Sequence, residues 1–204
     1  METYVEKKGT KTRQTEIVNK AIALIGELGP SGLTTARLAE RLGMSESNLY
    51  RHFNGKEAIL SSVIDEIGRL LMDKASAVAS EKIPPEDKLR LIMANHIREV
   101  EQRNGMPRLV FSEEMHVKYP ALREKLAKRI RGYVSTIELI LNEGVEDGSF
   151  NPDIRPAETA RAYLGMMQFA AMRWSLSGFS FSLEEEGRNL WINFYRMIRK
   201  QGQI

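Results

Sequence analysis

The stretch from Leu33 to Lys56, LTTARLAERLGMSESNLYRHFNGK, has the pattern of two short helices joined by a tight turn. A hydroxyl at Thr34 or Thr35 is placed to accept a hydrogen bond from a free N–H group at the start of the first helix. Gly43 suits the turn, because glycine enters left-handed backbone conformations at little cost. Ser45 is placed to cap the second helix in the same way. The pattern predicts a helix-turn-helix unit.

The second helix of this unit has one anchoring face and one polar face. Leu49 and Phe53 are four residues apart, so they share a face that packs on the rest of the unit. The opposite face carries short donors and acceptors beside groups that reach phosphate, which is what a recognition helix needs in a DNA major groove. The predicted DNA-binding residues are Thr34, Thr35, Ser45, Ser47, Asn48, Tyr50, Arg51, His52 and Lys56.

Within that set, the roles differ. Ser45, Ser47, Asn48 and Arg51 are expected in or near the groove, with Asn48 suited to adenine and Arg51 to guanine or phosphate. Thr34, Tyr50, His52 and Lys56 are expected on phosphates. The alternatives for Tyr50 and His52 are a packing role and a place at the edge of the core.

The run GMSESNLYRHFNGKEAIL resembles the helix-turn-helix signature of the tetracycline-repressor (TetR) family of bacterial transcription regulators. Close agreement extends from Thr12 to Leu71, and beyond it the resemblance is one of architecture and length. Glu46 departs from the family, which often has a basic or neutral residue there. Because phosphate repels a carboxylate, we expect Glu46 to read a base, face a cation or point aside. The matching positions are Gly43, Ser45, Leu49, Tyr50, His52, Phe53 and Lys56.

The positive charge of the chain is concentrated at its N-terminal end. The first 56 residues hold 9 Lys and Arg and 6 Asp and Glu, so they carry the whole net charge of +3. A phosphate-binding surface is expected to be localised in this way. Residues 1–11 include Lys7, Lys8 and Lys11, and are predicted to be either a solvated tail or a basic arm that touches phosphates or the minor groove.

Composition excludes several other classes of protein. The chain of 204 residues contains no Cys, which excludes disulfides, thiolate metal sites and cysteine catalysis. No apolar run approaches the roughly 20 residues of a membrane-spanning helix. The N-terminus METYVEKKGTKTRQ lacks the apolar segment of a secretory signal, so a cytoplasmic protein is expected.

Apolar residues recur at helical spacing along the whole chain, which predicts an all-α fold of about nine helices. A helix over Thr12–Leu28, ended by Gly29-Pro30, completes a three-helix DNA-binding domain at residues 1–56. A long helix over residues 57–80 is expected to link it to a larger domain at residues 81–204. That second domain is expected to bind an effector and to dimerise.

The segment Pro156 to Leu176 has almost no polar face, so it must be covered on both sides. The motif Ser182-x-x-Glu185 is a capping box that opens the last helix. We predict that these two helices form a four-helix bundle with a second copy, as the family resemblance also implies; the alternative is that they complete a monomeric core. The predicted interface residues are Tyr163, Met167, Ala171, Trp174, Leu190, Trp191, Phe194 and Ile198.

The family resemblance also implies a ligand cavity in the second domain, whose occupant would change DNA affinity by linkage. For each residue the alternative is plain core packing. No metal site and no cofactor are expected, since His96 and His116 with Glu113 or Glu114 make a weak metal-binding set. The residues expected to line an apolar pocket are Met93, His96, Ile97, Val100, Phe111, Met115, Tyr133, Ile137, Met166, Met167, Phe169 and Trp174.

The sequence and the family resemblance together imply a homodimeric repressor that binds a palindromic DNA operator, with reading helices roughly 34 Å apart, and that a small, largely apolar effector releases. The alternative is a DNA-binding protein whose second domain engages another protein, as in chromosome organisation or cell division. An enzyme is not expected, because the chain lacks a phosphate-binding glycine loop, a nucleophile–base pattern and a metal-ligand cluster. An enclosed apolar cavity favours an effector, whereas a solid core with an exposed apolar groove favours a protein partner.

Overall fold

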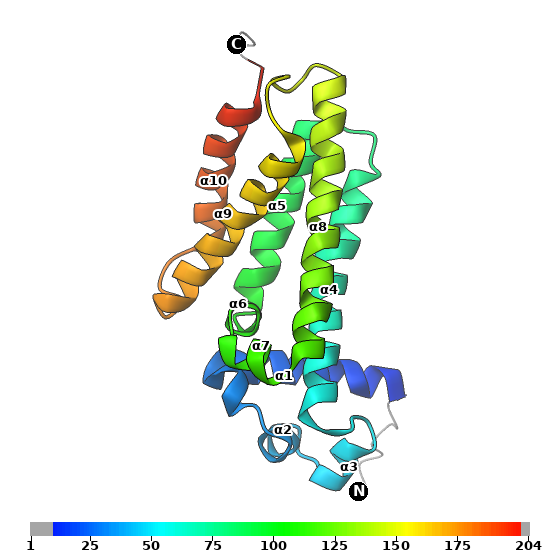
Figure 1. Ribbon diagram of the computed structural model, residues 1–204. Coiled ribbons are helices and arrows are strands. Elements are labelled where there is room, and N and C mark those ends of the chain that lie inside the picture. The colour runs from blue at the N-terminus through cyan, green and yellow to red at the C-terminus, as the bar shows by residue number, and fades with distance from the viewer. Residues whose placement is uncertain (1–9, 201–204) are drawn as a thin grey trace, which may run out of the picture.

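The computed structural model of this chain describes residues 10–200, and that part is all-α, as predicted (Figure 1). Strand pairing within it is limited to one isolated bridge between Phe150 and Arg199. The helices are α1 (Thr10–Gly32), α2 (Thr35–Arg41), α3 (Glu46–Tyr50), α4 (Gly55–Ala79), α5 (Pro85–Gln102), α6 (Gly105–Val110), α7 (Glu113–Lys118), α8 (Pro120–Glu146), α9 (Pro156–Leu176) and α10 (Leu183–Ile198).

The described residues form ten helices rather than the expected nine, because the helix predicted from Met106 to Met115 is two helices. Phe111 ends α6, and Ser112 caps α7 by accepting a hydrogen bond from the backbone N–H of Met115 at 3.2 Å. A capping serine in the middle of an apolar segment favours a new helix start over continuation.

Helices α1, α2 and α3 form a unit at one end of the molecule, opposite the end of α10 (Figure 1). Helical geometry in α1 breaks at Gly29, whose φ of 74° lies in the left-handed region, as the Gly-Pro pair predicts. Apolar side chains from the three helices, among them Ile17, Leu38 and Leu49, are fully buried. The predicted basic arm lies mostly outside the described residues, which begin at Thr10.

The unit is joined to the rest of the molecule by the packing of α1 as well as by the linking helix α4. Helix α4 continues upward from the end of α3, and α1 packs closely on α6. At Gly105 the two backbones meet, since an added Cβ would lie 2.0 Å from the carbonyl oxygen of Ile22. Buried apolar residues accordingly form one core cluster that extends from α1 to α10.

The remaining long helices, α4, α5, α8, α9 and α10, stand side by side above α1 (Figure 1). At their far end the chain after α8 folds back, so that the ring of Phe150 covers Gly144 and is itself fully buried. The backbone N–H of Asn151 donates to the carbonyl of Ile198 at 2.8 Å. The end of α10 is thereby attached to the turn after α8.

Candidate DNA interface and ligand pocket

The predicted caps of the helix-turn-helix are present. The hydroxyl of Thr34 accepts from the backbone N–H of Arg37, and the hydroxyl of Ser45 accepts from that of Asn48, each at 3.2 Å. Gly43 lies between the two helices with a φ of 62°, which only glycine adopts without strain. The local sequence therefore fixes the start of both helices and the turn between them.

Helix α3 presents its polar side chains on the outside of the molecule. Leu49 and Phe53 are buried beneath it, as their spacing predicts. Tyr50 is 51% exposed, so it does not pack into the core. The fold thus gathers the predicted groove-reading residues on one accessible face at the end of the molecule; Ser45, Ser47 and Arg51 are exposed there and Asn48 is half-buried.

Two of the predicted phosphate-binding residues, Lys56 and His52, are partly buried within the unit. The ammonium group of Lys56 donates to the carbonyl of Ser31 at 3.4 Å, and partial burial, together with nearby Lys118, lowers the pKa of Lys56. His52 is half-buried, and its Nδ1 atom is covered without a hydrogen-bond partner in residues 10–200. Phosphate contact by either side chain stays a prediction.

Glu46, which sequence reasoning left out of the DNA-binding set, faces a hydroxyl rather than a cation. Its Oε1 atom accepts a hydrogen bond from the Thr35 hydroxyl at 2.5 Å, which ties the first residue of α3 to the first residue of α2. Both side chains lie beside the capping residues of their helices. The signal in the sequence that could have identified Glu46 as a functional residue is its carboxylate at the start of the reading helix.

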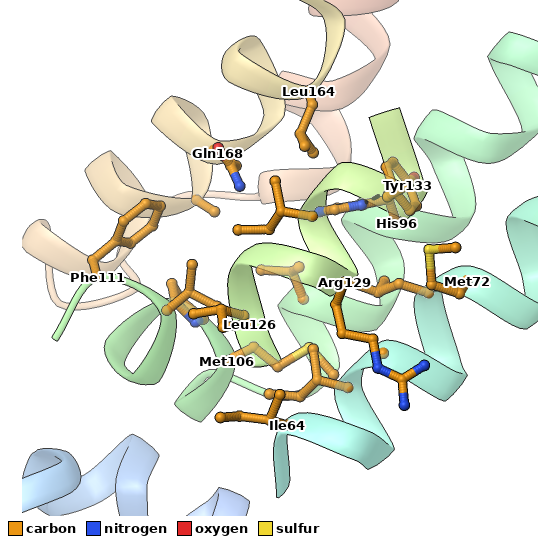
Figure 2. A pocket seen from close by; sticks show the side chains of 18 residues that line it. Ile64, Met72, His96, Met106, Phe111, Leu126, Arg129, Tyr133, Leu164 and Gln168 are labelled. Atoms are coloured by element: carbon orange, nitrogen blue, oxygen red, sulfur yellow. Dashed lines mark hydrogen bonds between the residues drawn. The ribbon is translucent and has the colours of Figure 1, made fainter. Parts of the chain in front are cut away.

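A pocket lies among α4, α5, α6, α8 and α9 and is partly open to solvent (Figure 2). Four of the predicted ligand residues line it: His96, Val100, Phe111 and Tyr133. The remaining lining residues are Ile64, Ile67, Gly68, Leu71, Met72, Met106, Pro107, Val110, Leu126, Arg129, Ile130, Leu164, Gln168 and Ala171. The lining is mostly apolar, with few polar groups.

Four polar side chains line the pocket. His96 and Tyr133 are buried and joined by a 3.1 Å hydrogen bond between Nδ1 and the phenolic oxygen, with their rings edge to face. Burial lowers the pKa of His96 to about 4 and raises the pKa of Tyr133. The imidazole is therefore neutral at pH 7, and it is suited to hydrogen bonding rather than to pairing with an anion. Arg129 and Gln168 are the other polar side chains of the lining (Figure 2).

The other predicted ligand residues lie elsewhere. Met115, Ile137, Met167 and Trp174 are buried core residues outside the pocket lining, and Met166 is partly buried against the core. Met93 and Ile97 face a groove between α5 and α10. Phe169 is 61% exposed on the outside of α9. Helical periodicity identified these residues as apolar, but it did not indicate which of them border a space.

Sequence reasoning missed the pocket wall that α4 provides. Ile64, Ile67 and Leu71 lie on the apolar stripe of this helix and face the pocket. The stripe was expected to pack on another part of the protein, and no sequence signal separates a cavity wall from a packed face. Gly68 marks the site, because an added Cβ would lie 2.9 Å from the Cδ atom of Arg129.

The predicted dimer interface needs correction, because most of its residues are buried within the single chain. The Tyr163 hydroxyl donates to the carbonyl of Leu89 at 2.6 Å, and the indole N–H of Trp174 donates to the carbonyl of Phe181 at 2.9 Å. Ala171 lines the pocket, and only Leu190 and Trp191 are half-buried. The other fully internal residues of the predicted set are Met167, Phe194 and Ile198.

The exposed side of α9 nonetheless carries a row of apolar residues, two of them small. Ala162, Gly165, Phe169 and Leu176 follow one another at helical spacing, and all four are exposed. On neighbouring α10, Met197 is exposed as well. Helix α9 therefore has few polar residues on either side: its inner face is buried in the core, and its outer face is apolar and exposed to solvent.

Among the helices of residues 10–200, none combines the length and apolarity needed to cross a membrane.

Family models match two parts of the chain: the bacterial regulatory proteins of the tetR family at residues 17–63, and the tetracyclin repressor-like C-terminal domain at residues 82–179. These ranges coincide with the helix-turn-helix unit and with most of the helices around the pocket.

Similar proteins and structures cover nearly the whole chain. Nucleoid occlusion factor SlmA of Vibrio vulnificus is 25% identical over 184 residues, which are 89% of this chain and 93% of SlmA. Two structures share the fold: FadR from Bacillus subtilis in complex with stearoyl-CoA (TM-score 0.76, 20% identity, 91% of this chain and 99% of that one) and AibR with isovaleryl coenzyme A and operator DNA (TM-score 0.72, 20% identity, 88% and 96%). The chain belongs to the TetR family of bacterial regulatory proteins, and it is a DNA-binding transcription regulator rather than an enzyme.

Proposed function

We propose that this protein is a homodimeric repressor that binds a palindromic operator and leaves it when a small, largely apolar effector enters the pocket. The observation that carries the proposal is the position of α4. This helix begins beside α3, at Gly55, and its residues Ile64, Ile67 and Leu71 form one wall of the pocket. A ligand that moves this wall also moves the reading helix.

The pocket also has a second route to the DNA-binding unit. Met106 and Pro107 of α6 line the pocket, and the neighbouring Gly105 contacts the backbone of α1. Helix α1 packs on both α2 and α4. An effector that fits one arrangement of α4 and α6 better than another shifts DNA affinity by that difference in binding free energy.

We further propose an acyl compound, such as an acyl-CoA thioester, as the effector. The lining is mostly apolar along α4, α6 and α8, as an acyl chain requires, and Gln168 offers a polar partner for a head group beside Arg129, whose guanidinium donates to Asp65. Two solved structures of the same fold hold ligands of this class, stearoyl-CoA and isovaleryl coenzyme A. A neutral His96 suits a carbonyl better than a carboxylate.

The homodimer is proposed through the outer faces of α9 and α10, where Ala162, Gly165, Phe169 and Met197 are exposed. Small residues allow two helices to approach closely, and burial of the larger side chains supplies the hydrophobic free energy. A dimer sets two α3 helices on successive turns of duplex DNA, which a single short helix needs for specific binding. Such a regulator works in the cytoplasm, where the DNA is.

Fluorescence anisotropy of a labelled operator, obtained by selection from random duplexes, tests the effector proposal. We expect one or more acyl-CoA compounds in a series from isovaleryl-CoA to stearoyl-CoA to weaken operator binding by about 5- to 150-fold, while CoA alone has no effect. Release by CoA alone, or by none of the series, contradicts an acyl effector.

A matched pair of variants shows whether release passes through the pocket. Val100→Phe places a larger side chain in the pocket lining and fills part of the pocket. Val117→Phe makes the same substitution at an exposed position on α7. We expect Val100→Phe to bind the operator and to lose the acyl-CoA response, with the response intact in Val117→Phe. Equal responses in both variants place the effector outside the pocket.

The likeness to SlmA favours one alternative, a DNA-binding protein whose second domain engages another protein. In that case no member of the acyl-CoA series changes the affinity for the operator, and Val100→Phe binds the operator as the wild type does. The same titration therefore separates the two functions.

A further inference from the structure

The carboxylate of Glu46 stands on the surface that meets DNA, and nothing in residues 10–200 neutralises it. Glu46 is the first residue of α3 and is exposed. In residues 10–200 it accepts a hydrogen bond from the Thr35 hydroxyl, which is neutral, and it forms no ion pair there. A bare negative charge beside the phosphate backbone weakens binding, unless the carboxylate finds a hydrogen-bond donor on the DNA.

The edges of the bases in the major groove decide which donor is suitable. Guanine and thymine present acceptors there, which repel a carboxylate. Adenine presents an amino donor, but its N7 acceptor lies beside it, whereas the amino group of cytosine has no acceptor on the same base edge. Only cytosine therefore gives a carboxylate an attractive contact without a repulsive one from the same base.

We propose that Glu46 reads the amino group of a cytosine in each half of the operator, and that Thr35 is the residue that positions it. Thr35 is half-buried at the start of α2, directly after the capping residue Thr34, so its hydroxyl is held in place. The hydrogen bond from Thr35 occupies Oε1 of Glu46 and leaves Oε2 for the base. The proposal rests on the sequence-specific DNA binding proposed above.

Selection of bound duplexes from a random library, with the full-length protein and three variants, provides the test. We expect the wild type to require cytosine at one position of each half-site. Glu46→Gln is expected to prefer adenine at that same position, because an amide pairs with both the amino group and N7 of adenine. Glu46→Ala is expected to accept every base there, and Thr35→Val to discriminate less without a new preference.

A modified operator tests the contact atom itself. 4-Methylcytosine still pairs with guanine but carries a methyl group in place of the hydrogen that faces the major groove. Placed in one half-site, it is expected to weaken wild-type binding by about 10- to 100-fold, the value of a good base contact. The same change is expected to leave the affinity of Glu46→Ala unaltered.

The outcomes distinguish this inference from the proposed function. If the wild type enriches no sequence at all, sequence-specific binding itself is wrong. If it enriches a motif whose bases are the same for the wild type and Glu46→Gln, or if 4-methylcytosine is tolerated at the selected position, the role of Glu46 is overturned while the regulator remains.

Discussion

At the scale of single residues, the buried pair His96 and Tyr133 is a polar feature within the core of the larger domain. Both rings lie beside the pocket, and their hydrogen bond satisfies the imidazole Nδ1 atom and the phenol. No acidic side chain in the described structure pairs with the His96 imidazole, so burial alone lowers its pKa and keeps the ring neutral. The pair fixes a neutral, polar spot in an otherwise apolar wall.

The lowered pKa of His96 predicts a pH dependence of stability. Burial lowers it from 6.5 to about 4, so the unfolded chain binds a proton there at a higher pH than the folded chain does. The free energy of unfolding is thus unaffected by His96 above pH 6.5, and it falls by about 3 kcal/mol as the pH drops to about 4.

Urea unfolding of the wild type and of His96→Leu between pH 7 and pH 4.5 measures this contribution. We expect the variant to show the smaller loss of stability across that range. Tyr133→Phe is the control, because it removes the hydroxyl but leaves the imidazole buried, and it should keep the wild-type dependence. Parallel pH curves for the wild type and His96→Leu would assign the titration to other groups.

At the scale of helices, the boundaries were predictable where one residue type has a single physical role. Thr34, Ser45 and Ser182 each cap the helix that the sequence assigned to them. Pro120 and Pro156 begin α8 and α9 as proline in a first turn predicts. These signals act between neighbours in sequence, so they need no knowledge of the tertiary fold.

The faces of the helices were not predictable in the same way. An apolar residue has the same signature whether it meets the core, a cavity or a second chain. Phe169 was therefore assigned to a pocket although it is exposed, and Tyr163 to an interface although it is buried. The stripe of α4 likewise gave no sign that Ile67 and Leu71 border a space rather than a packed neighbour.

The bare outer face of α9 predicts the oligomeric state. Phe169→Glu places a charge where we propose that two copies meet, and the cost of burying that charge should separate them. Sedimentation velocity is expected to show a dimer for the wild type and a monomer for the variant. Leu139→Glu is the matched control, since Leu139 is 69% exposed on α8 and should leave the dimer intact. A dimer that survives Phe169→Glu would locate the interface elsewhere.

The fold-back after α8 predicts a separate effect on stability. The Phe150 ring is fully buried against Gly144, at the point where the end of α10 is attached. Phe150→Ala is expected to lower the free energy of unfolding by about 3–5 kcal/mol, as other buried aromatic truncations do. Phe111→Ala, at a 40% exposed position, should cost less in the same denaturation experiment. Equal losses would mean that the fold-back is not tightly packed.

At the scale of the whole molecule, the pocket and the reading helix are close together. From Gly55 to Ile64 helix α4 rises by about 14 Å, so a small tilt at the pocket reaches α3 over a short distance. Asp65 attaches α4 to α8 just there, since it accepts hydrogen bonds from Lys125 at 2.5 Å and Arg129 at 3.0 Å. Burial raises the pKa of Asp65, but the hydrogen bonds and charges of these two cations together outweigh it, so the pKa is lowered.

The distribution of charge over the whole chain complements this mechanical arrangement. The net charge of +3 lies in the first 56 residues, and a dimer doubles it on the surface that faces DNA. Binding of such a surface to DNA releases counterions, so affinity falls as salt is added. The size of that salt dependence reports how many phosphates the dimer neutralises.

The last prediction follows from counting those phosphates. If Lys56 contacts one phosphate in each half-site, Lys56→Ala removes two contacts from the dimer. The slope of log affinity against log salt concentration should then become shallower by about 1.8, because each phosphate contact contributes about 0.9. Lys82→Ala, an exposed lysine just before α5, removes the same charge far from the reading helix and should leave the slope unchanged. Anisotropy titrations on the selected operator from 50 to 200 mM salt, a range of about fourfold, resolve this difference. Equal slopes for the wild type and Lys56→Ala would show that Lys56 neutralises no phosphate and that other cations hold the backbone.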